Sequence, residues 1–278
     1  PAPYWVSYPE QVRICGGSPI ILNTKQEDGF KITKKQIESR CTDKTKILVL
    51  NYPSNPTGST YNVDELKEIA DICKEKNLII ISDEIYDKIL YSNEKHISFP
   101  QLSKDAKNRT ILVNGVSKTY SMTGWRIGYA AGNPDVISAM NNLSGQSTSN
   151  PTSISQKAAI EAFAGKQDKV EEMLNEFQVR KDYISSFLNG IEGVKCFVPK
   201  GAFYVFPDIS YYFGKTYKDK EIKNSIDFTD FLLNHAKVAV VPGIEFGSDN
   251  HIRISYATSM EDIKEGTARI KNSLKDLL

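Results

Sequence analysis

Two short apolar runs on either side of an amphipathic helix constrain the fold more than any other feature of this sequence. The runs ILVL at 47–50 and LIII at 78–81 are rich in β-branched residues and are followed by polar or turn residues, as is typical of buried parallel strands. Between them, apolar residues recur at helical spacing from Val63 onward, with Asn62 as the expected N-cap and Glu65 three residues later. This stretch therefore predicts one β-α-β unit.

Further strand-like runs extend the same sheet and predict a right-handed, mostly parallel α/β domain with helices on both faces. These runs are TILV at 110–113 and RIGYAA at 126–131. Residues 153–188 read as a helical connector with a break near Ala164-Gly165. Ligands of such sheets bind at the carboxyl ends of the strands.

The pattern changes after Gly193 and predicts a second, smaller α+β domain. Short strands are expected in VKCFV, AFYVF, VAVV at 238–241 and HIRISYA at 251–257, with one helix near 226–236 and another at the C-terminus. A length of 278 residues favours two domains. We therefore expect a large domain with the connecting helix over 1–180 and a small domain over 181–278.

Composition excludes several classes of function. Lys and Arg number 35 against 34 Asp and Glu, so the net charge is +1 and gives no general attraction for nucleic acid. No apolar stretch approaches the roughly 18–20 residues that span a bilayer, and the start lacks the pattern of a signal peptide. The four widely spaced cysteines favour free thiols over a metal site or a disulfide framework. A cytoplasmic protein without a metal or a membrane partner is expected.

Polar side chains follow three of the predicted strands. Lys118 comes soon after TILV, Asp83 directly follows LIIIS with Tyr86 three residues later, and Asn55 lies in the turn after ILVL. Each has an ordinary alternative: a lone lysine is usually exposed, an aspartate often caps a helical turn, and NYPSNPTG is a plain turn signal. The convergence at the strand ends is more informative than any one residue and predicts a ligand site there.

Five segments carry a resemblance to a known family. They are NYPSNPTG, SDEIY, SKTYSMTGWRIGY, VPGIEFG and HIRISYA, and the likeness extends over essentially the whole chain. In this order and spacing, the chain resembles the class I aminotransferases of fold type I, which depend on pyridoxal 5′-phosphate. The segments PAPYWVSYPE and QSTSNPTSISQ are most similar to those of bacterial aspartate aminotransferases.

The resemblance implies a role for each candidate residue around the cofactor. Lys118 matches the lysine that binds the cofactor covalently and then moves the proton at the substrate α-carbon, and Asp83 matches the carboxylate that faces the pyridine nitrogen. Tyr86 and Asn55 match donors to the phenolic oxygen, and the Asn55-Pro56 bond is expected to be cis by analogy. The remaining cofactor contacts implied are Ser117 and Arg126 for the phosphate and Trp5 for the ring, a buried core tryptophan being the alternative for Trp5.

For the substrate, the resemblance implies that Arg253 grips the α-carboxylate, supported by Asn55 and Trp5. A planar guanidinium suits a bidentate carboxylate contact, although an exposed strand arginine would look the same in sequence. Some aspartate-specific relatives place an arginine of the partner chain, shortly before their SNP sequence, against a distal carboxylate. NNLSGQSTSNP has no arginine, so the distal specificity stays open.

The expected function is transfer of an amino group between aspartate and 2-oxoglutarate by a homodimer, through ping-pong half-reactions. The alternatives are an aromatic or prephenate aminotransferase, a carbon–sulfur β-lyase and a cofactor-sensing domain of a transcriptional regulator. Family members begin upstream of Pro1 with a glycine-rich turn that cradles the cofactor phosphate. We therefore expect that the N-terminal part of the fold is missing and that cofactor binding is weaker than in a full-length protein.

Overall fold

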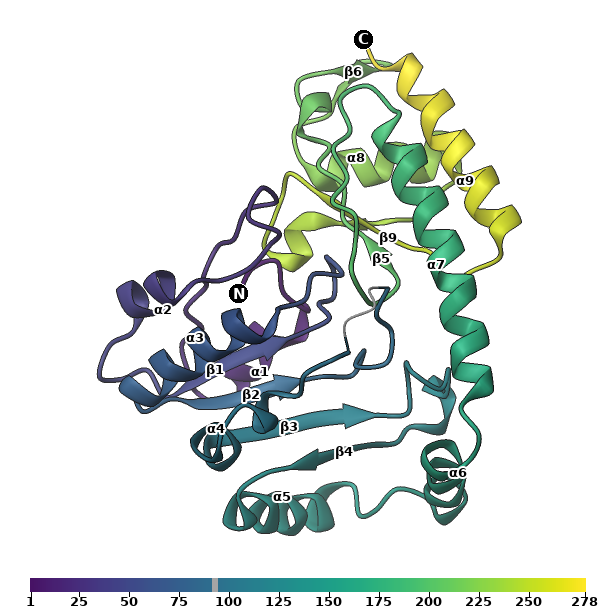
Figure 1. Cartoon of the computed structure of the whole chain (residues 1–278). Helices are drawn as coiled ribbons and strands as arrows, with labels where there is room; N and C mark the ends of the chain where they lie inside the picture. Colours follow the sequence, from purple (N-terminus) through teal and green to yellow (C-terminus); the bar gives the residue numbers. More distant parts are fainter. Residues whose placement is uncertain (92–94) are drawn as a thin grey trace. The chain divides into compact units, whose positions relative to one another are not determined.

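The computed structural model describes residues 1–91 and 95–278, and the chain divides into two compact units (Figure 1). The sheet unit consists of Lys31–Pro53 and Thr60–Leu174. The terminal unit consists of Pro1–Phe30, Ser54–Ser59 and Asn175–Leu278. The predicted domain boundary at residue 180 stays a prediction.

The sheet unit contains four strands in the order β1-β2-β3-β4, namely β1 (Ile47–Asn51), β2 (Ile79–Asp83), β3 (Thr110–Gly115) and β4 (Gly128–Ala131). The first two pairings are parallel, and β4 pairs antiparallel with β3. The register aligns Asn51 with Asp83 and Asp83 with Val113, so three strands reach the same edge together. A mostly parallel sheet is thus confirmed, with all four predicted strands in place.

Helix α3 (Val63–Glu75) forms for the reason that the sequence indicates. Asn62 Oδ1 accepts from the Glu65 amide at 2.9 Å, and Glu65 Oε2 accepts from the Asn62 amide at 2.7 Å, which completes a reciprocal cap. Leu66 and Ile72 are fully buried. Such a cap contributes about 1 kcal/mol, and the buried apolar face contributes more.

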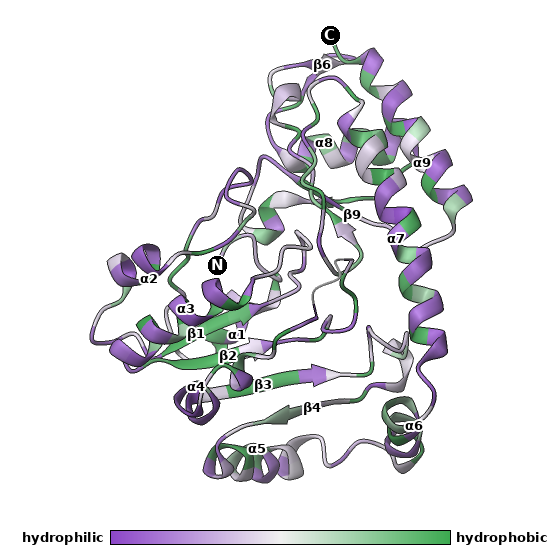
Figure 2. Cartoon of the chain, in the orientation of Figure 1, coloured by the Kyte–Doolittle hydropathy of each residue, from purple (hydrophilic) through white to green (hydrophobic). Residues whose placement is uncertain are grey.

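The strands β1, β2 and β3 are mainly hydrophobic, whereas the helices of the sheet unit carry apolar and polar faces (Figure 2). The other helices of the unit are α2 (Lys34–Arg40), α4 (Lys104–Arg109), α5 (Pro134–Ser147) and α6 (Ser153–Ala164). The sequence predicts the last of these, and its end at Ala164 confirms the break before α7 (Asp168–Asn189).

The terminal unit is built on an antiparallel sheet in the order β5-β9-β8, whose strands are β5 (Tyr204–Val205), β9 (Ile252–Ser255) and β8 (Val241–Pro242). It also contains α1 (Ser7–Ile14), the part of α7 from Asn175 onward, the hairpin β6 (Thr216–Tyr217) and β7 (Lys220–Glu221), α8 (Ser225–Phe231), the π-helical turn Leu232–Ala236 and α9 (Met260–Ser273). A core of Phe30, Phe206 and Phe246 is joined by His251, whose ring stacks on Phe206 at 4.8 Å.

Two predicted strands of this unit differ from the structure. VAVV at 238–241 overlaps β8 only at Val241, because residues 238–240 are not in a strand. VKCFV at 194–198 is not a strand and pairs only through an isolated bridge between Lys195 and Asp208. The reason is that the backbone N–H and C=O of Cys196 bond to the side chain of Asn189, at 2.8 and 2.9 Å, in place of a neighbouring strand.

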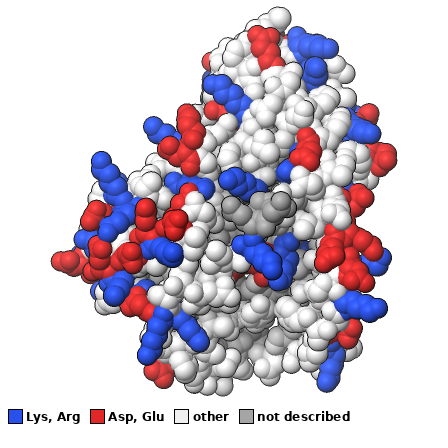
Figure 3. All heavy atoms as spheres, viewed as in Figure 1, with Lys and Arg blue, Asp and Glu red and all other residues white. Residues whose placement is uncertain are grey.

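No helix among residues 1–91 and 95–278 is long and apolar enough to cross a membrane. On the face seen in Figure 3, basic and acidic side chains occur together over the surface, in keeping with the net charge of +1. The four cysteines carry free thiols, as the sequence predicts.

Candidate active site

Asp83 and Lys118 leave neighbouring parallel strands at the same edge of the sheet. Asp83 is the last residue of β2 and lies opposite Val113 of β3, while Lys118 follows the end of β3 at Gly115 by three residues. Carboxyl ends of parallel strands form the usual ligand site of such sheets. The structure thus brings the two segments that carry the predicted acid and amine to one edge.

The backbone and side chain of Asp83 are both fixed by hydrogen bonds. Its carbonyl oxygen accepts from Asn51 Nδ2 at 3.0 Å and from the Tyr52 amide at 3.2 Å. Its Oδ1 accepts from the Ile85 amide at 3.2 Å, which starts a tight turn over residues 85–88. Tyr86 lies in this turn and is only 2% exposed. The carboxylate is therefore oriented before any ligand binds.

The turn that carries Lys118 is tied to the turn that carries Tyr86. The Lys118 carbonyl accepts from the Ser121 amide at 3.2 Å, and the hydroxyl of Thr119 donates to Asp87 Oδ1 at 3.2 Å. Ser117 and Lys118 are both partly buried. The hydrogen bond between Thr119 and Asp87 links the loops after β2 and β3 and fixes the relative positions of their polar groups.

Arg126 occupies an unusual backbone position just before β4. Its φ of 53° places it in the left-handed region, where it ends the 3-10 turn Thr123–Trp125. The side chain is exposed, and Nη1 donates to the Thr123 carbonyl at 2.8 Å. The 3-10 turn before Arg126 thus holds its guanidinium. The role of Arg126 as a phosphate contact stays a prediction.

Arg253 and Asn55, which stand 198 residues apart in sequence, meet within the terminal unit. Arg253 Nη1 donates to Asn55 Oδ1 at 3.0 Å, and Arg253 Cζ lies 4.7 Å from the Tyr204 ring centroid and 4.9 Å from that of Phe246. Arg253 is partly buried, so the alternative of an ordinary exposed strand arginine is wrong. The guanidinium is held between aromatic rings and an amide oxygen.

Asn55 is positioned by a crowded loop. It is 7% exposed, and the Asn55-Pro56 bond is cis as expected. Gly58 has a φ of +67°, and a Cβ added there would lie 2.3 Å from Pro199 Cβ and 2.6 Å from the Gly201 carbonyl oxygen. The close packing of Gly58 against 199–201 requires glycine at this point of the motif.

Trp5 is not the buried core residue that the alternative required. It is 37% exposed and packs edge-to-face against Tyr8, with ring centroids 5.3 Å apart. It belongs to the terminal unit, as do Asn55 and Arg253, whereas the other predicted residues belong to the sheet unit. Its stacking on a cofactor ring stays a prediction.

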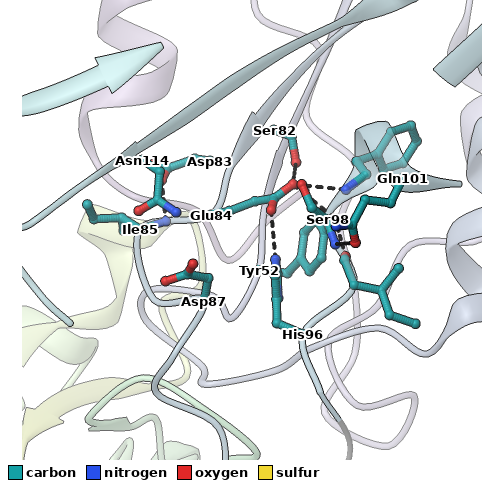
Figure 4. Close-up of polar contacts among 12 residues, drawn as sticks. Tyr52, Ser82, Asp83, Glu84, Ile85, Asp87, His96, Ser98, Gln101 and Asn114 are labelled. Carbon is teal, nitrogen blue, oxygen red and sulfur yellow. Dashed lines mark hydrogen bonds and ion pairs between the residues drawn. The ribbon is translucent and has the colours of Figure 1, made fainter. Parts of the chain in front are cut away.

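A buried polar cluster next to Asp83 was not predicted (Figure 4). Glu84 is 2% exposed, and its carboxylate accepts from the Ser82 hydroxyl at 2.8 Å, the Phe99 amide at 3.0 Å and His96 Nε2 at 2.7 Å. Burial alone would raise the pKa of Glu84, but the bond and charge of His96, with the Phe99 and Ser82 donors, hold the pKa below its ordinary value. The available signal was an acidic residue beside an apolar strand in a chain with three histidines.

The chain is similar to known proteins of one family. Residues 1–270 match the family described as "Aminotransferase class I and II". The aspartate aminotransferase of Bacillus sp. (strain YM-2) is 50% identical over 275 residues, which cover 99% of this chain and 69% of that protein. The probable aspartate/prephenate aminotransferase of Rickettsia typhi is 49% identical over 279 residues, which cover 100% of this chain and 70% of that protein.

Among solved structures, the aspartate aminotransferase from Rhizobium meliloti superimposes with a TM-score of 0.96 at 41% identity, over 100% of this chain and 70% of that one. The predicted resemblance and the fold type I architecture are thereby confirmed. With an identity near one half over its whole length, the chain belongs to the class I and II aminotransferase family.

Proposed function

We propose that the chain acts as an aminotransferase that uses pyridoxal 5′-phosphate to move an amino group between L-aspartate and 2-oxoglutarate. The observation that carries the proposal is the departure of Asp83 and Lys118 from neighbouring parallel strands at one sheet edge. The aspartate aminotransferases among its relatives support the choice of substrate.

The donor set on the sheet unit fits this cofactor group by group. The Asp83 carboxylate suits the ring nitrogen, the buried Tyr86 phenol suits the phenolic oxygen, and the Lys118 amine suits the aldehyde carbon. Ser117 and Arg126 offer a hydroxyl and a guanidinium for the phosphate. Bound there, the cofactor would supply a ring that withdraws electrons from the substrate α-carbon.

The proton transfers are assigned to Lys118. Its amine would remove the proton from the substrate α-carbon as a general base and then return it as a general acid. The Asp83 carboxylate, already oriented by the Ile85 amide, would accept a hydrogen bond from the ring nitrogen and stabilise its positive charge.

Arg253 would bind the α-carboxylate of the substrate. Because Arg253 Nη1 donates to Asn55 Oδ1, the guanidinium is held in a fixed plane, and a planar guanidinium suits a two-bond grip on a carboxylate. Such a grip would fix the orientation of the substrate α-carboxylate.

Borohydride reduction followed by peptide mapping tests the proposal. The label should be found on Lys118, and replacement of Lys118 by Ala should remove it. Labelling of another lysine would refute the assignment.

A panel of amino donors with 2-oxoglutarate tests the substrate. Aspartate should be the preferred donor. Preference for aromatic donors or prephenate would favour the second candidate, which the Rickettsia typhi relative's description supports. Pyruvate release from cystathionine would instead indicate a β-lyase.

A homodimer acting in the cytoplasm is part of the same proposal and is supported by the family resemblance. Sedimentation equilibrium tests the dimer: a mass near twice 31.2 kDa is expected, and a monomer at micromolar concentration would contradict it.

A further inference from the structure

The Glu84 carboxylate accepts several hydrogen bonds, more than its position between Asp83 and the next turn requires. Its donors are Ser82 on β2 and, on the stretch before α4, His96 and the Phe99 amide. The Tyr52 hydroxyl after β1 also lies 3.3 Å from Oε1 and shares its proton with the Ile97 carbonyl at 3.1 Å (Figure 4). A buried carboxylate costs stability unless it is fully bonded. The cluster therefore anchors the start of the loop after β2 to its surroundings.

The polar contact of the His96 ring is with Glu84. His96 Nε2 lies 2.7 Å from Glu84 Oε2, and because a carboxylate oxygen accepts hydrogen bonds, Nε2 is the donor in this contact. The His96 ring lies tilted against Tyr52, with centroids 5.1 Å apart. Its Nδ1 is buried and has no hydrogen-bond partner among residues 1–91 and 95–278. Glu84 is thus the single polar contact of the ring within that part of the chain.

The anchored carboxylate is directly connected to the orientation of Asp83. Glu84 N donates to the Val113 carbonyl at 2.9 Å, and Glu84 O accepts from the Asp87 amide at 3.0 Å, so the backbone of Glu84 begins the turn. This turn brings the Ile85 amide to 3.2 Å from Asp83 Oδ1. If the Glu84 side chain is released, the turn loses one of its buried attachments, the one next to Asp83, and the Ile85 amide that orients Asp83 gains freedom to move.

We propose that Glu84 and His96 form a positioning pair that sets the direction of the Asp83 carboxylate through the Ile85 amide. Neither residue contacts the cofactor in this scheme. The inference rests on the proposed function for what Asp83 binds, but the orientation of Asp83 itself can be measured without any ligand.

Hydrogen exchange at the Ile85 amide of the whole chain, without cofactor, is the first test. Replacing His96→Ala removes the donor to Glu84 and should accelerate Ile85 exchange at least tenfold, with the amides of α9 unchanged. Replacing His96→Gln restores an N–H near the former Nε2 and should bring the rate to within about threefold of the wild type. An unchanged Ile85 rate in His96→Ala, or no recovery in His96→Gln, would overturn the inference.

Cofactor titration is the second test. If His96 only stabilised the fold, its replacement would weaken cofactor binding equally with and without the Asp83 carboxylate. His96→Ala should weaken pyridoxal phosphate binding about tenfold in the wild-type background but less than threefold in an Asp83→Asn background. Equal losses in both backgrounds would show that His96 does not act through Asp83.

The control is His235→Ala, which breaks another histidine–carboxylate pair, with Asp276 at 2.7 Å in the terminal unit. It should alter neither measurement. Wild-type chain that binds no pyridoxal phosphate would count against the proposed function, whereas the Ile85 exchange rates would still decide the inference.

Discussion

Replacing Arg253→Lys keeps the positive charge but removes the planar fork, and the structure sets the expected size of the effect. In the free protein the guanidinium already bonds to Asn55 and lies against Tyr204 and Phe246. These contacts exist before and after substrate binding, so the energy of the contacts themselves largely cancels from the affinity. The remaining loss is one charge-assisted hydrogen bond to the α-carboxylate, worth about 1.5–3 kcal/mol. The substrate dissociation constant should therefore rise by about 10- to 150-fold.

Single-turnover kinetics of the half-reaction with aspartate measure this dissociation constant. A comparison ligand, 3-aminopropanoate, is aspartate without its α-carboxylate, and its binding should change less than about threefold. Arg180→Lys is the matched control, because Arg180 lies over the Phe177 ring at 5.8 Å on α7 and has no assigned role. Equal losses for both ligands, or full affinity for aspartate, would refute the carboxylate role of Arg253.

Three further predictions concern the lysine, a buried histidine and a crowded glycine. Lys118→Ala should abolish turnover and covalent attachment of pyridoxal phosphate, and a retained borohydride-stable label would contradict the assignment. Burial lowers the pKa of His251, with the Asp208 charge opposing it, so the unfolded chain takes up the proton first. The free energy of unfolding should fall as the pH drops through about 6.5, by at most about 1.4 kcal/mol per pH unit. In urea unfolding, His251→Phe should reduce this dependence on pH, and an unchanged dependence would show that His251 is not its cause. Gly58→Ala should destabilise the chain by about 1–3 kcal/mol more than Gly214→Ala, because Gly214 also has a positive φ but has no atom within 4 Å of an added Cβ. Equal losses of stability would show that the loop around Gly58 relaxes.

Local signals were sufficient where the contacts are close in sequence. The cap between Asn62 and Glu65 and the end of α6 at Ala164 are both confirmed, because such signals lie within one or two helical turns. The direction of β4 could not be read, since an apolar run carries no information on whether its neighbour is parallel. VKCFV has the composition of a strand, but the Asn189 side chain takes the backbone groups of Cys196.

In the candidate site too, local features could be predicted from the sequence and long-range contacts could not. The motifs indicate which polar groups follow the strands, because the strand periodicity locates their ends. Contacts between distant segments are not encoded locally: Arg253 meets Asn55 across 198 residues, and His96 meets Glu84 from beyond the next turn. Only the folded chain shows these two contacts.

The aromatic setting of Arg253 has a thermodynamic consequence. A free arginine side chain loses about 2 kcal/mol of rotamer entropy when it is immobilised. Here the rings of Tyr204 and Phe246 and the Asn55 amide immobilise it during folding, so a ligand that arrives later meets an already ordered anchor. Calorimetry of dicarboxylate binding should accordingly record a smaller unfavourable entropy than in a variant whose Tyr204 is replaced by alanine.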